Sequence, residues 1–232
     1  MLKKIDRYYQ EELLLLSSTL SKLLKRRFGK GPEACSLTFH SNKIIVHIRN
    51  FITPAEDVLV NNDQLRLAHL FRTSVMETVF REFADEATNV LGVTFDSYFD
   101  DWNYEENSGM LLLENMSSLS WEETQLNPIL KDKIFDTMIQ ICAEIHKAPS
   151  KLEIVSINPN MYMIESQGIL LQVEKILFSK GHLNIIQDRS FEIKDCYLEH
   201  KDRLQRVFET KINQMYLMWD YEKDRSLLFV HL

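Results

Sequence analysis

Apolar residues recur every three or four positions over residues 13–24, which is the spacing of a helix with one buried face. Gly29-Lys30-Gly31-Pro32 follows and predicts the end of this helix, because glycine favours a helix C-terminus and proline cannot continue a helix. Runs rich in β-branched and aromatic residues at 34–40 and 43–49 predict a hairpin around Ser41-Asn42. The apolar face of the helix comprises Leu13, Leu14, Leu16, Leu20, Leu23 and Leu24.

Thr53-Pro54-Ala55-Glu56 predicts the start of a second helix. Thr53 suits the N-cap, Pro54 the first helical position and Glu56 the third. Apolar residues at helical spacing over 64–89 then predict a long helix, which Gly92 ends. Two strands at 93–103 and 110–114, joined by a polar turn, complete this part of the chain.

The same order of elements recurs after a short polar junction near residues 115–127. The recurrence predicts two structurally equivalent halves. The elements expected in the second half are a helix over 129–146, strands over 151–157 and 161–165, a segment over 168–178, a helix over 197–213 and a closing hairpin of 215–221 and 226–232.

An ungapped offset of 117 positions (149 − 32) aligns the halves, and two of the three tryptophans match at it. We therefore predict an α+β fold built by tandem duplication of a helix–hairpin–helix–hairpin unit, the first over 1–115 and the second over 119–232. Long helices should cover each antiparallel sheet. A pseudo-twofold axis should relate the units, because a small unit buries more apolar surface against a symmetric mate. Pairs matched by the offset include Pro32 with Pro149, Lys30 with Lys147, Arg72 with Arg189 and Trp102 with Trp219.

The net charge of −7 argues against general binding of nucleic acid. Cys35, Cys142 and Cys196 show no metal-ligand or disulfide spacing, which favours a reducing, cytoplasmic setting. The apolar runs are shorter than the roughly 18–20 residues of a membrane span. Neither a catalytic motif nor a metal or cofactor motif is recognisable, so we expect no enzymatic activity, no metal and no cofactor.

Two basic features are candidate binding sites. Gly29-Lys30-Gly31-Pro32 is either a helix stop or an anion-binding loop; the stop is favoured because phosphate loops precede a helix. The basic patch either complements the negative end of the helix dipole or docks to an anionic membrane or acidic partner. This patch consists of Lys22, Lys25, Arg26 and Arg27.

Two further candidates lie later in the first half. Thr53, Pro54 and Glu56 form either a capping device alone or part of a binding site. Arg72, which the offset pairs with Arg189, suggests a structural ion pair more than a binding residue.

Gly29-Lys30-Gly31-Pro32, the strand pair, Ile52-Thr53-Pro54-Ala55-Glu56, Arg72, Gly92 and the closing acidic hairpin occur in an order and spacing that resembles the MpsC family. The resemblance covers about residues 3–114. It implies a link to a sodium-translocating, membrane-potential-generating system whose membrane-spanning partners are implicated in sodium and inorganic carbon transport.

The second half departs from this pattern. At the same offset His146-Lys147-Ala148-Pro149 replaces the glycine loop, and Leu170-Leu171-Gln172-Val173 replaces Thr-Pro-Ala-Glu. Any role shared with the family is therefore expected in residues 29–72.

These observations lead us to expect a non-catalytic, cytosolic accessory or regulatory binding protein, peripheral at the inner face of the membrane. Its expected partner is a membrane-protein complex, with self-association as a further expectation. The alternatives are a small-molecule sensor with its ligand between the two halves, or an enzyme of unrecognised type. An exposed apolar patch near residues 53–56 would favour partner binding, whereas a deep polar pocket would favour the sensor.

Overall fold

A computed structural model shows that the chain divides into two compact units, Met1–Trp121 and Glu122–Leu232. Each unit contains one four-stranded antiparallel sheet built from short strands rich in apolar residues. The structure describes residues 9–118, 120–122 and 126–232. The elements of the first unit are α2 (Gln10–Phe28), β1 (Ala34–His40), β2 (Lys43–Arg49), α3 (Pro54–Asn61), α4 (Leu65–Leu91), β3 (Ser97–Asn103) and β4 (Ser108–Glu114).

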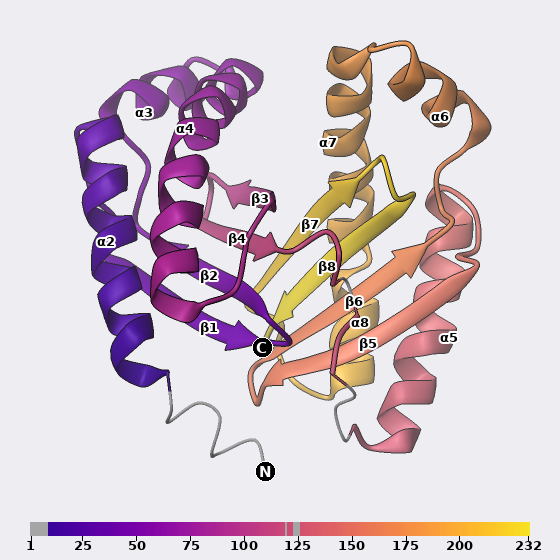
Figure 1. Ribbon diagram of the computed structural model, residues 1–232. Coiled ribbons are helices and arrows are strands. Elements are labelled where there is room, and N and C mark those ends of the chain that lie inside the picture. The colour runs from indigo at the N-terminus through magenta and orange to yellow at the C-terminus, as the bar shows by residue number, and fades with distance from the viewer. Residues whose placement is uncertain (1–8, 119, 123–125) are drawn as a thin grey trace. The chain divides into compact units, whose positions relative to one another are not determined.

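The first sheet has the strand order β1-β2-β4-β3, with every neighbouring pair antiparallel. Helices α2 and α4 lie side by side on one face of this sheet (Figure 1). Successive strand residues point to opposite faces, so Leu111 and Leu113 of β4 join Leu20 and Leu24 of α2 in the core beneath the helices. The predicted cover of the sheet by long helices is confirmed for this unit.

The local signals in the first unit act as predicted. Gly29 ends α2 in the left-handed conformation (φ 76°), and its N–H donates to the carbonyl of Lys25. The hairpin turn has positive φ at both Ser41 and Asn42, as a two-residue turn of this kind requires. Two details were wrong: Leu14 is exposed rather than part of the buried face of α2, and β3 begins at Ser97 rather than at residue 93.

The second unit repeats this layout with the strand order β5-β6-β8-β7. Its core packs apolar residues of α5 and α8 against the sheet, including Ile141, Leu204 and Leu228. The α+β class and the similar topology of the two sheets are therefore confirmed. Its elements are α5 (Pro128–Ile145), β5 (Lys151–Asn158), β6 (Met161–Gln167), α6 (Gln172–Ser179), α7 (Leu183–Glu199), α8 (Lys201–Phe208), β7 (Gln214–Asp220) and β8 (Arg225–His231).

The offset between equivalent elements changes along the chain. It is 117 for β1 and β5 (151 − 34) but 118 for β2 and β6 (161 − 43), because β5 carries an irregularity between Ser156 and Asn158 that inserts one residue. It stays at 118 for α3 and α6 (172 − 54) and returns to 117 for β3 and β7 (214 − 97). An ungapped alignment is therefore out of register by one residue in the middle of the unit.

The helix predicted over 197–213 was wrong. The chain is already helical from Leu183, the helix is interrupted at His200, and α8 ends at Phe208. The apolar residues of α7 do not mark one clear stripe, because Leu183 and Ile185 are exposed and only Ile186, Ile193 and Tyr197 are buried. The pseudo-twofold relation concerns the placement of the units and stays a prediction.

Candidate functional site

The N-terminus of α3 carries a complete capping box. The Thr53 hydroxyl accepts from the Glu56 backbone N–H at 3.4 Å, and Glu56 Oε2 accepts from the Thr53 N–H at 2.9 Å and from the Thr53 hydroxyl at 2.7 Å. Pro54 occupies the first turn, where its missing N–H costs nothing. The predicted cap is confirmed, and it leaves the Glu56 carboxylate pointing into the protein.

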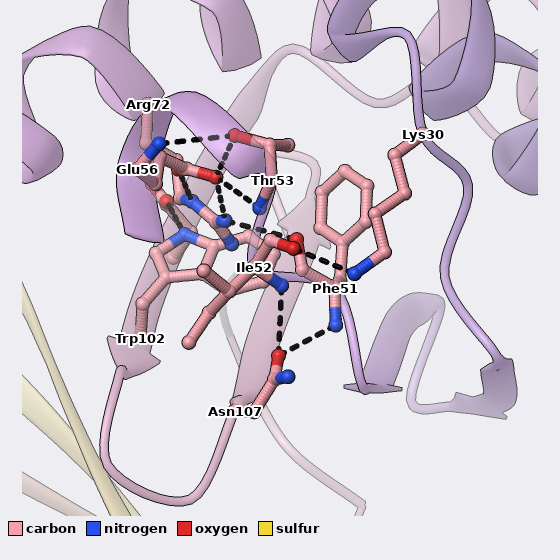
Figure 2. Close-up of polar contacts among 9 residues, drawn as sticks. Lys30, Phe51, Ile52, Thr53, Glu56, Arg72, Trp102 and Asn107 are labelled. Atoms are coloured by element: carbon pink, nitrogen blue, oxygen red, sulfur yellow. Dashed lines mark hydrogen bonds and ion pairs between the residues drawn. The ribbon is translucent and has the colours of Figure 1, made fainter. Parts of the chain in front are cut away.

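Arg72 of α4 meets that carboxylate in a buried ion pair (Figure 2). Its Nη2 donates to Glu56 Oε2 at 2.6 Å, its Nε donates to Oε1, and its Nη2 also donates to the Phe51 carbonyl at 3.1 Å. Arg72 is 2% exposed and Glu56 fully buried. Burying two charges costs desolvation energy, and these hydrogen bonds offset that cost. The prediction that Arg72 belongs to a structural ion pair is confirmed.

Aromatic rings surround the buried guanidinium. The centroid of the Trp102 ring lies 4.0 Å from Arg72 Cζ, and the rings of Phe51, Tyr104 and Phe28 follow at 5.0, 5.3 and 5.8 Å. A cation over ring faces in a water-poor setting gains electrostatic stabilisation. Arg72 therefore links helices α3 and α4 to strand β3 and to the end of α2.

A carboxylate and a phenol beside this cluster have raised pKa values. The Trp102 indole N–H donates to Asp100 Oδ2, yet burial outweighs this bond and raises the pKa of Asp100 to about 6. Burial also raises the pKa of Tyr104. Tyr104 stays neutral at pH 7, whereas Asp100 gains a proton at mildly acidic pH.

The two motifs predicted from sequence meet across the segment that precedes α3. Lys30 Nζ donates to the Ile52 carbonyl at 2.7 Å, while Asn107 Oδ1 accepts from the N–H groups of Phe51 and Ile52, both at 2.7 Å (Figure 2). Arg72 holds the Phe51 carbonyl in the same segment. The strand-to-helix connection is thus held by side chains from three separate parts of the chain.

Gly31 and Pro32 make no such bond to this segment in the hydrogen bonds of the described residues; they shape the loop that carries Lys30. Sequence reasoning missed Asn107 and the role of Trp102. A signal was available for Asn107 in the sequence: it lies in a polar turn, and the offset of 117 pairs it with Asp224, another residue type that tolerates positive φ.

The second unit keeps a looser version of this arrangement. Glu174 Oε2 accepts from the Leu171 N–H and Asp224 Oδ1 from the Leu170 N–H, both at 2.7 Å. Arg189 Nε lies 3.5 Å from Glu174 Oε1, and Arg189 is 36% exposed. The expected loss of the Thr-Pro-Ala-Glu segment is therefore corrected. The shifted register aligns it with residues 171–174, Leu-Gln-Val-Glu, so of the four residues only the glutamate is retained.

His146 lies against the second tryptophan, where the first unit places a guanidinium. The rings of His146 and Trp219 meet edge to face with centroids 5.3 Å apart. Burial, with a smaller effect of the Arg189 charge, lowers the pKa of His146 to about 4. The imidazole is therefore neutral at pH 7, and no cation covers Trp219 in the described contacts of this unit.

One acidic residue, Glu82 of α4, neutralises part of the predicted basic patch. Arg26 and Arg27 both pair with Glu82 of α4, and the Arg27 hydrogen bond is the main reason that the pKa of Glu82 is lowered. Lys22 and Lys25 are exposed on α2. A groove of about 510 Å³ beside them is lined by residues of both signs, namely Lys22, Arg26, Glu82, Asp85 and Glu86, with Thr19 and Leu23.

Four apolar side chains on α3 and the first two turns of α4, which follow the capping box in the chain, are exposed. We call Val58, Leu65, Leu67 and Phe71 the first corner; each is at least 40% exposed. The equivalent connection between α6 and α7 exposes Val173, Ile176, Leu183 and Ile185, the second corner. At the local offset of 118 (183 − 65), three positions match: Val58 with Ile176, Leu65 with Leu183, and Leu67 with Ile185.

The described residues bring together no group of three or more His, Cys, Asp or Glu side chains that could hold a metal ion. None of the described helices is both long and apolar enough to cross a lipid bilayer.

Comparison with known proteins finds a matching family for the first unit alone. Neither a curated protein nor a solved structure matches the chain significantly. The family match stops at the last residue of β4 and leaves the second unit outside it. Residues 14–114, from α2 to the end of β4, match the family described as "Na+-translocating membrane potential-generating system (MpsC)", which confirms the resemblance for the first unit.

Proposed function

We propose that this chain is a non-catalytic, cytoplasmic accessory protein that binds a protein component of a membrane ion-transport system. The observation that carries this proposal is the first corner, an exposed apolar surface directly after the capping box at residues 53–56. Leu67 and Phe71 are four positions apart and share one face of α4, and adjacent exposed apolar side chains are typical of sites where a protein meets a partner.

The geometry around Arg72 supports a positioning role for the predicted site residues. Both oxygens of Glu56 are occupied by Arg72 and Thr53, and the guanidinium is enclosed by aromatic rings. Such a cluster holds a helix corner rigid, because each polar group is satisfied from within the fold. Thr53, Glu56 and Arg72 would therefore act by fixing the corner, and Lys30 by holding the segment before it.

The family of the first unit supports the choice of partner. Its description names a Na+-translocating membrane potential-generating system. A chain related to such a system, with an exposed apolar corner, fits an accessory subunit that docks to the membrane-embedded part. The alternative of a sensor with its ligand between the halves depends on the placement of the two units and stays a prediction.

The proposal is tested by affinity purification of the tagged chain from detergent-solubilised membranes of its native host. We expect the parent chain to retain membrane proteins of an ion-transport system and a variant with Leu67→Asp and Ile185→Asp to lose them. Leu14→Asp is the matched control, since Leu14 is an exposed leucine on α2, away from α3 and α4 in the sequence. Equal recovery by all three chains, or recovery of soluble proteins alone, would refute the proposal.

A further inference from the structure

We draw no further inference here: the strongest candidate, the side-chain cluster of His146, Trp219 and Glu174 in the second unit, leaves both imidazole nitrogens, the indole N–H and the carboxylate Oε1 without a hydrogen-bond partner among the described residues, but their contacts do not show these atoms converging on a cavity that a ligand could enter.

Discussion

Replacement of Arg72 by methionine tests whether the buried ion pair holds the first unit together. Methionine keeps much of the volume of the side chain but removes both bonds to Glu56, the bond to the Phe51 carbonyl and the cation above Trp102. Glu56 would keep its bonds from Thr53 and remain a buried carboxylate without a counter-charge. Removing one partner of a buried pair costs about 3–5 kcal/mol.

The second unit supplies a matched control. Arg189 faces the equivalent glutamate at 3.5 Å but is 36% exposed, so water already screens the pair. Replacing Arg189 by methionine should cost about 0–1 kcal/mol. A double variant of the first unit, with Arg72→Met and Glu56→Gln, keeps a capping side chain without a buried charge. It should be more stable than Arg72→Met alone by at least about 1 kcal/mol.

The assay is urea unfolding of the whole chain at pH 7.5, with hydrogen exchange at the amides of β2, β4, β6 and β8 to assign each change to a unit. The expected loss for Arg72→Met appears as faster exchange in the first unit. A cost within about 1 kcal/mol of that for Arg189→Met would refute the argument that burial makes the first pair structurally important.

Three further outcomes follow from single residues. The pKa of His146 is lowered from 6.5 to about 4, so the neutral imidazole stabilises the fold above pH 6.5 and this stabilisation is lost as the pH falls towards 4. Between pH 7.5 and pH 5 the free energy of unfolding of the parent in urea should therefore fall by about 1–2 kcal/mol more than that of His146→Phe. An equal fall in both proteins would contradict this. The pKa of Asp100 is raised from 3.8 to about 6, so the stabilisation by its protonated form is lost as the pH rises through 6. Asp100→Asn should therefore raise the free energy of unfolding by about 1–2 kcal/mol at pH 7.5 but not at pH 4. No gain at pH 7.5 would contradict the raised pKa of Asp100. Thr53→Ala removes the N-cap hydroxyl and should cost about 1 kcal/mol in the same assay, whereas Thr53→Ser should cost less.

Local chemistry made much of the first unit predictable. The Ser41-Asn42 turn, the glycine stop at Gly29 and the cap at Thr53 each depend on neighbouring residues only, and each occurs as expected. The order of elements could be read from the same kind of signal, because helical and strand periods differ. Short-range rules therefore sufficed for most element boundaries.

Which residue of one half corresponds to which residue of the other was harder to predict from the sequence. A single inserted residue in β5 shifts the register, and the sequence gives no clear sign of it between Ser156 and Asn158. As a result Glu174 was not recognised as the counterpart of Glu56, although both occupy the third position of their helices. Backbone pairing was needed to place the shift.

The site itself depends on contacts between distant residues. Arg72 lies 16 positions from Glu56 along the chain and 30 from Trp102 (102 − 72), and nothing in the local pattern predicts that all three meet. The exposure of Leu67 was equally hidden, because its helical spacing is the same as that of a core residue. Which apolar positions of α4 face solvent is decided by its packing against α2 and α3.

The most direct test of the central claim is photo-crosslinking in the native host with a benzophenone side chain at position 67. The docking account predicts a crosslink between the first corner and a membrane-spanning protein, and no such crosslink from position 14, which is also an exposed leucine. A crosslink of equal yield from both positions, or to lipid alone from position 67, would contradict the claim that the corner between α3 and α4 docks a membrane partner.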